Sequence, residues 1–264
     1  MIEPLVVVDG NHRLAAHFGA TKPLSATSAK AVQAALARFV DGAIWVARPS
    51  PMMKWLADRE AITKTRNRLL LIGNAKPRER AFFRAVFENV ISSDDDMRLL
   101  GLDDLFEVLG SPNRANLFIA GAVTAAAKSL VLIRGNLDSL VVPFSLFTAR
   151  PNGPKPDYSD FEIIDSGQTI RLGHYEAAVD AVLYELDVEF RRHERKRQIS
   201  EDKSFGGALR RLRMQRGLAR DAFAGITAKT IARIERGEVK KPHTDTVATI
   251  AARLGVKVDE IATY

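Results

Sequence analysis

The chain of 264 residues contains no cysteine. Disulfide bonds, thiolate zinc sites and cysteine nucleophiles are therefore excluded, and the composition favours a reducing cytoplasm. No apolar run approaches the roughly 18 residues that a membrane span requires. The start, Met1-Ile2-Glu3-Pro4, lacks the basic and apolar regions of a secretory signal. We therefore expect a cytoplasmic protein that has no membrane partner.

The sequence also lacks the constellations that support catalysis or metal binding. Its five histidines, at positions 12, 17, 174, 193 and 243, show no pairing with carboxylates at ligand spacing. It has no phosphate-loop glycine pattern and no Gly-x-Ser-x-Gly elbow. Asp94-Asp95-Asp96 is interpreted as the cap of a helix start rather than as a cation site. We expect no metal, no cofactor and no enzymatic activity.

Positive charge is in excess, and it is unevenly distributed. The chain carries a net charge of +7. Residues 191–264 hold 18 Lys and Arg against 9 Asp and Glu, a net charge of +9, whereas residues 1–190 hold 21 against 23. A basic segment joined to a near-neutral body is typical of a module that binds a polyanion, although a solvated basic tail has the same composition.

Residues 1–112 alternate short apolar runs with amphipathic stretches, a pattern that favours a small α/β domain. Its role is not indicated by the sequence. The expected strands are Val6-Val7-Val8, Ile44-Trp45-Val46 and Leu69-Leu70-Leu71-Ile72, and the expected helices are residues 13–18, 28–39 and 78–90.

Residues 113–190 predict a β-rich α+β domain, because β-branched runs alternate with turn formers. A hairpin tip is expected at residues 134–136, a proline-rich loop at 151–156 and a closing helix from Val179 to Phe190. This piece resembles a small domain of unknown function that often precedes helix-turn-helix domains in bacterial proteins, which implies a docking or dimerisation role. The expected strands are residues 130–133, 140–143 and 161–164.

A basic run, Arg191-Arg192-His193-Glu194-Arg195-Lys196-Arg197, follows without a break signal. Residues 191–203 either extend the preceding helix or form a linker. The run could contact a nucleic-acid backbone, or it could be a solvated helix between domains.

Residues 204–264 show the periodicity of five short helices packed around one core, as in a compact bundle. Ser204 and Thr227 are good N-caps, and Gly217 and Gly237 are typical helix ends. The expected helices are residues 204–217, 220–223, 228–236, 244–255 and 258–261. The expected core residues are Phe205, Leu209, Leu212, Ile231, Ile234, Val247, Ile250 and Leu254.

Several stretches of this region are similar to the Cro and lambda-repressor (XRE-type) helix-turn-helix family. The stretches are Gly217-Leu218, Thr227-Ala228-Lys229-Thr230-Ile231-Ala232-Arg233-Ile234-Glu235-Arg236-Gly237, Pro242, and Ile250-Ala251-Ala252-Arg253-Leu254-Gly255-Val256. The resemblance implies an all-α DNA-binding domain over residues 204–264 of a multidomain α+β chain.

The resemblance also implies roles for individual residues. The third helix, 228–236, enters the major groove of double-stranded DNA with its N-terminal residues against base edges. The residues that contact bases are then Thr227, Ala228, Lys229 and Arg233. The residues that contact the backbone are Arg220, Thr230, Arg236, Lys240 and Lys241.

The resemblance further implies a structural ion pair between Arg213 and Glu235, which belongs to the scaffold and not to the reading surface. The sequence departs from the family between Arg220 and Gly225, where the second helix is about three residues shorter than usual. This shortening puts the geometry of the Arg220 phosphate contact in doubt.

A second resemblance is local. The turn at residues 9–16, after the valine strand, resembles the phosphate-gripping turn of the ParB and sulfiredoxin-like family, with His12 and Arg13 at a helix start. The strands that precede this turn in that family are missing here. The alternative, which we favour, is a strand-turn-helix in which Asp9 or Asn11 caps the helix.

Together these patterns predict a sequence-specific transcriptional regulator, an autoregulating repressor that binds DNA as a homodimer. Two alternatives stay open. One is a nucleic-acid enzyme whose N-terminal domain handles phosphate. The other is an antitoxin-type module that binds a protein partner through residues 1–190.

Overall fold

A computed structural model describes residues 3–11, 13–18, 22–57, 64–92, 97–149, 151–239 and 241–261. The chain divides into two compact units, Met1–Leu186 and Asp187–Tyr264. The first unit contains both segments that the sequence analysis treated separately, 1–112 and 113–190, apart from the last four residues of the latter.

The first part of the N-terminal unit is a five-stranded parallel sheet in the order β2-β1-β3-β4-β5. Its strands are rich in apolar residues because helices cover both faces of a parallel sheet. β1 and β3 contain two of the expected strands, and β4 contains the third except for Ile72. The strands are β1 (Leu5–Val8), β2 (Leu24–Ala26), β3 (Ile44–Ala47), β4 (Arg68–Leu71) and β5 (Asn89–Ser92).

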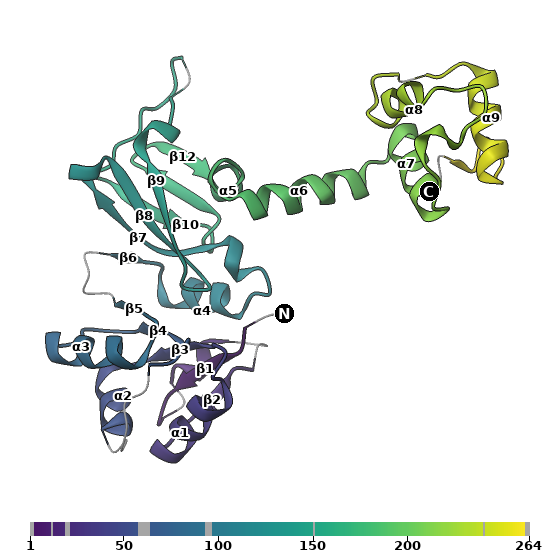
Figure 1. Cartoon of the computed structure of the whole chain (residues 1–264). Coiled ribbons are helices and arrows are strands. Elements are labelled where there is room, and N and C mark those ends of the chain that lie inside the picture. The colour runs from purple at the N-terminus through teal and green to yellow at the C-terminus, as the bar shows by residue number, and fades with distance from the viewer. Residues whose placement is uncertain are drawn as a thin grey trace. The chain divides into compact units, whose positions relative to one another are not determined.

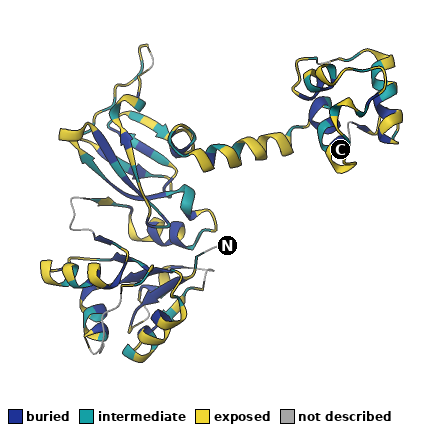
Figure 2. Ribbon diagram, in the orientation of Figure 1, coloured by how far each residue is buried: buried dark blue, intermediate teal, exposed yellow. Residues whose placement is uncertain are grey.

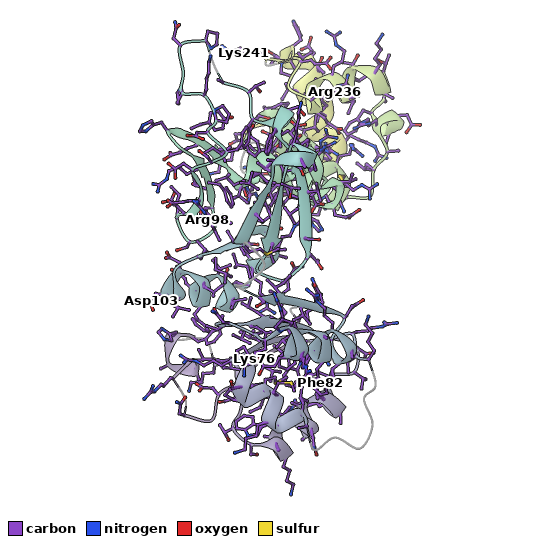
Figure 3. The ribbon with its side chains drawn as sticks, turned by 90° about the vertical axis from the view of Figure 1, so that its left-hand side faces the viewer. Lys76, Phe82, Arg98, Asp103, Arg236 and Lys241 are labelled. Atoms are coloured by element: carbon purple, nitrogen blue, oxygen red, sulfur yellow. The ribbon has the colours of Figure 1, made fainter. Side chains whose placement is uncertain are left out.

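Three helices cover one face of this sheet: α1 (Ala29–Arg38), α2 (Pro49–Leu56) and α3 (Pro77–Val86) (Figure 1). The opposite face carries the 3₁₀ turn η1 (Ala15–Phe18) and α4 (Leu102–Gly110). Figure 3 marks α3 by Lys76 and Phe82 on one side of the sheet and α4 by Asp103 on the other. The sheet is accordingly buried on both sides (Figure 2), as the burial of every residue of β1 and β3 shows.

Two expected helices differ from those observed. The helix predicted over residues 78–90 ends at Val86, because the next residues turn extended and Val90 pairs with Leu69 as part of β5. The helix predicted over residues 13–18 is reduced to η1, a single 3₁₀ turn. The β-branched and apolar residues of β5 fit an edge of the sheet better than another helical turn.

The second part of the N-terminal unit consists of two antiparallel sheets, in the orders β6-β7-β8-β9 and β10-β11-β12. Its expected hairpin tip lies between β8 and β9, and the helix α5 (Val179–Leu186) closes the part. The strands are β6 (Arg98–Leu99), β7 (Phe118–Thr124), β8 (Ser129–Arg134), β9 (Ser139–Pro143), β10 (Phe161–Ile164), β11 (Thr169–Leu172) and β12 (Tyr175–Ala178). Single 3₁₀ turns are η2 (Arg114–Asn116), η3 (Ala125–Ala127) and η4 (Phe144–Leu146).

Arg68 ties the two parts of the N-terminal unit together. Its Nη1 donates to the carbonyl oxygen of Asn136 at 2.5 Å and to Asp138 Oδ1 at 2.7 Å, and its Nη2 contacts Glu3. Asn89 Nδ2 adds a bond to the carbonyl oxygen of Leu137 at 2.8 Å. The parallel sheet and the β8–β9 hairpin therefore form one unit rather than two independent domains.

The C-terminal unit begins with a break that the sequence analysis did not place. The helix expected to continue to Phe190 ends at Leu186, and Asp187 caps a new helix, α6 (Val188–Glu201). Asp187 Oδ1 accepts the N–H groups of Glu189 and Phe190 at 2.9 and 3.0 Å. The basic run 191–197 is therefore helical, and its charge is partly paired within the helix, as in the Glu194–Arg197 contact of 2.8 Å.

The remaining elements of this unit are α7 (Phe205–Gln215), η5 (Arg220–Ala222), α8 (Ala228–Glu235) and α9 (Thr244–Leu254). They match the first four expected helices, with the second reduced to a 3₁₀ turn. The fifth was expected over 258–261, where residues 258–260 form a turn and Ile261, which is buried, is in 3₁₀ conformation. All eight expected core residues belong to the apolar cluster of the unit or pack against it.

Candidate nucleic-acid interface

The position of α8 is set first by its close approach to α7. A Cβ atom on Gly206 would lie 2.1 Å from the carbonyl oxygen of Ile234, so only glycine fits where the start of α7 meets the end of α8. Ile231 and Ile234, which are 0% and 1% exposed, turn the inner face of α8 into the core. The packing therefore fixes which face of α8 points outward.

The start of α8 is closed by its own side chains. Thr227 Oγ1 accepts the N–H of Thr230 at 3.1 Å, and the two hydroxyl oxygens lie 2.9 Å apart. Gly225, with φ of 77°, makes the turn before the cap. The Thr230 hydroxyl, which the resemblance assigned to a phosphate, is engaged in this cap and is half-buried.

A buried carboxylate joins three elements of the domain. Glu235 Oε1 accepts from Arg213 Nε at 2.5 Å, and Glu235 Oε2 accepts from Arg220 Nε at 2.9 Å. The Glu235 side chain is 1% exposed and that of Arg213 is 11% exposed. Arg213 Nη1 also donates to the carbonyl oxygen of Leu218 at 2.6 Å. The structure thus brings together Arg213 and Glu235, the two residues for which the sequence predicts an ion pair.

Arg220 contacts Glu235, a partner that was not expected from the sequence. The resemblance gave it a DNA phosphate, but in the structure its Nε is bound to Glu235 while 41% of its side chain stays exposed. The contact joins the single turn η5 to the end of α8. Arg253 Nε supports η5 by donating to the carbonyl oxygen of Ala222 at 2.8 Å.

The outward face of α8 carries the residues proposed from sequence to read bases. Thr227, Ala228, Lys229 and Arg233 are all exposed. Lys229 and Arg233 are four residues apart, so they share a face of the helix. This face is opposite to Ile231 and Ile234.

The expected backbone-contacting residues lie at the end of α8 and beyond it. Arg236 and Lys241 are exposed, and both are labelled in Figure 3. Lys240 lies outside the described residues. Gly237, with φ of 71°, follows the end of α8 and is itself exposed, as is Glu238.

Glu238 is an unexpected member of this surface. Its carboxylate accepts from Arg236 Nε at 2.6 Å and from Arg233 Nε at 3.3 Å. The hydrogen bond from Arg236 holds the pKa of the Glu238 carboxyl below its usual value, so the group is ionised at neutral pH. The signal in the sequence was the spacing Arg233-x-x-Arg236-x-Glu238, which places one carboxylate within reach of two cations.

The described residues offer no group of three or more histidines and carboxylates that could hold a metal ion. Within the same ranges no helix is long and apolar enough to cross a membrane. The exposed side chains of Lys229, Arg233 and Arg236 supply ammonium and guanidinium donors, which suit phosphate oxygens and the acceptors of guanine.

Comparison with known families agrees with this geometry. A family model described as a helix-turn-helix domain matches residues 204–263. No curated protein and no solved structure matches the chain. Residues 204–263 therefore form a helix-turn-helix domain, whereas the resemblance noted for residues 113–190 is not confirmed.

We predict that Glu235→Ala destabilises the C-terminal domain by about 3–5 kcal/mol, because removal of one member of a buried ion pair leaves the other charges unpaired. The measurement is hydrogen exchange of the α8 amides in the full chain. The matched control is Glu238→Ala, which also removes a carboxylate bound to two arginines but at an exposed position. Equal protection of α8 in both variants would contradict the buried role of Glu235.

Proposed function

We propose that this protein is a sequence-specific transcriptional regulator that reads the major groove of double-stranded DNA with α8. The observation that supports this proposal most directly is the outward face of α8, where exposed Lys229 and Arg233 project from a helix whose other face is fixed in the core. The helix-turn-helix match over the same residues supports it independently.

In this proposal the residues divide into two groups by what they contact. Lys229 and Arg233 donate to guanine O6 and N7, while Thr227 and the Ala228 methyl lie at the N-terminal end of the reading helix. Arg236, Lys241 and Lys240 donate to phosphates beside that helix. The exposed part of the Arg220 guanidinium is available for a further phosphate, while its Nε stays on Glu235.

The N-terminal unit supplies self-association or a protein partner in this proposal, and the protein acts as an autoregulating repressor. We propose no catalytic role.

The turn at residues 9–16 argues against the phosphate-handling alternative, because Asp9 Oδ2 accepts the N–H groups of Leu14 and Ala15 at 2.5 and 3.2 Å. Those amides are satisfied by the chain itself, so they do not form an open phosphate cradle. His12 lies outside the described residues.

The first prediction from this proposal distinguishes residues that contact bases from residues that contact the DNA backbone. Selection from a randomised duplex library, followed by footprinting, defines the operator. Arg233→Ala should then weaken operator binding by about 1–3 kcal/mol and leave binding to random duplex nearly unchanged. Lys241→Ala should weaken both alike and lower the slope of log affinity against log salt by about 0.9. Equal losses on both DNAs for Arg233→Ala would place that residue on a phosphate instead.

The second prediction concerns Glu238. Glu238→Gln should tighten binding to random duplex by roughly twofold to fivefold, because it removes a negative charge from the surface and releases Arg236, which is proposed to contact a phosphate. Glu260→Gln, which makes the same change of charge after α9, is the control for net charge. An equal gain in both variants would mean that the contact with Glu238 does not restrain Arg236.

The third prediction concerns assembly. One small domain makes few base contacts, so we expect a dimer on a two-fold site whose half-sites lie about 10 base pairs apart or at a multiple of that spacing. Sedimentation of the full chain with operator DNA measures the stoichiometry. A single chain that protects one asymmetric half-site would contradict this expectation.

A further inference from the structure

The parallel sheet of the N-terminal unit contains a point at which the direction of its winding reverses. β1 lies between β2 and β3, so the chain leaves β1 toward one neighbour and later enters the sheet again on the other side. After β1 the turn η1 packs against α4, whereas the chain that leaves β3 enters α2, which packs with α1 and α3 in the core on the opposite face of the sheet. Two loops that diverge in this way leave a crevice at the carboxyl ends of the strands, where ligands bind in open α/β sheets.

A pocket occupies this crevice. Its volume is about 410 Å³, within the range of sites for small molecules. It is formed by two segments nearly forty residues apart in the sequence. The lining residues are Val8, Asp9, Gly10 and Asn11 after β1, and Arg48, Ser50, Pro51, Lys54 and Trp55 at and within α2.

The charge that this pocket presents is positive. Arg48 and Lys54 are exposed, and neither side chain has a hydrogen-bond or ion-pair partner among the residues that the structure describes. The one carboxylate of the lining, Asp9, is 5% exposed and is turned onto the amides of its own turn. Its charge is therefore stabilised by the backbone, and the two cations face the pocket without a counter-ion.

An aromatic wall completes the pocket. A Cβ atom on Gly10 would lie 3.2 Å from the ring of Trp55, so the indole rests against the backbone of the turn after β1. Trp55 is only partly buried and contributes to the lining of the pocket. Its indole gives the pocket more apolar surface than the binding of a phosphate alone would need. The indole ring and the two cations together suit a ligand that has both a flat ring and an anionic group.

We propose that this crevice binds a small organic anion of the nucleoside monophosphate class. The phosphate lies between Arg48 and Lys54, and the base lies against the indole of Trp55. The site is separate from the DNA-contacting surface of the other unit, so its occupancy does not depend on the proposed function.

The test uses the fluorescence of the full-length protein without DNA. The chain has two tryptophans. Trp45 is 0% exposed, so a ligand in the crevice changes the emission of Trp55. We expect saturable binding of at least one of AMP, GMP, CMP and UMP, with calorimetry as a second readout. Adenosine, which lacks the charge, and inorganic phosphate, which lacks the ring, should bind more weakly than the nucleotide.

Arg48→Ala should weaken nucleotide binding by about tenfold or more, because a charge-assisted hydrogen bond is lost. Both Arg48 and the control residue are exposed, so neither change is expected to affect folding. The control is Arg38→Ala, which should leave binding unchanged. Arg38 is the last residue of α1 and therefore lies at the amino ends of the strands, away from the crevice. The proposal is overturned if none of the four nucleotides binds at millimolar concentration, if inorganic phosphate binds as tightly as the nucleotide, or if Arg48→Ala has no effect.

Discussion

Glu235 accepts hydrogen bonds from Arg213 and Arg220 while its side chain is almost fully buried, and the arrangement of the helix-turn-helix domain depends on this contact. A carboxylate in that position is tolerated only with its partners in place, because an unpaired buried charge is costly. The pair therefore couples the end of α7, the turn η5 and the end of α8. Once these are coupled and Ile231 is in the core, the rotation of α8 about its axis is set. Lys229 and Arg233 point outward as a consequence of that packing.

The local features of this domain could be predicted from sequence because they depend on neighbouring residues. Thr227 caps the third helix as expected, and Ile231 and Ile234 lie in the core as their helical spacing indicates. The contact between Arg220 and Glu235 could not be predicted in this way. It joins two residues that are 15 apart in the sequence and belong to η5 and α8, so it depends on how these two elements pack in three dimensions.

In the N-terminal unit the limit of sequence reasoning lies in topology. The central strands β1, β3 and β4 were identified from apolar runs, since strands covered on both faces lack alternation. The edge strands were not, because Leu24–Ala26 is short and Asn89–Ser92 follows directly on a helix. Without the edge strands the strand order cannot be predicted. The reversal of winding between β1 and β3 cannot be predicted either. The crevice at that reversal, formed by residues around Asp9 and Arg48, therefore becomes visible only in the structure.

Each of the two basic surfaces includes a carboxylate, and the environment of that carboxylate affects how the nearby cations can bind an anion. Asp9 is buried and bound to backbone amides, so its charge is already satisfied and does not compete for the cations of the crevice. Glu238 is exposed and bound to Arg233 and Arg236. A phosphate that binds these arginines must therefore displace the Glu238 carboxylate or be repelled by it. In the proposed complex, an acid that repels phosphates and competes with them for Arg236 lowers affinity for every DNA sequence. Correct base contacts can offset that cost only at the operator, so Glu238 favours discrimination over affinity.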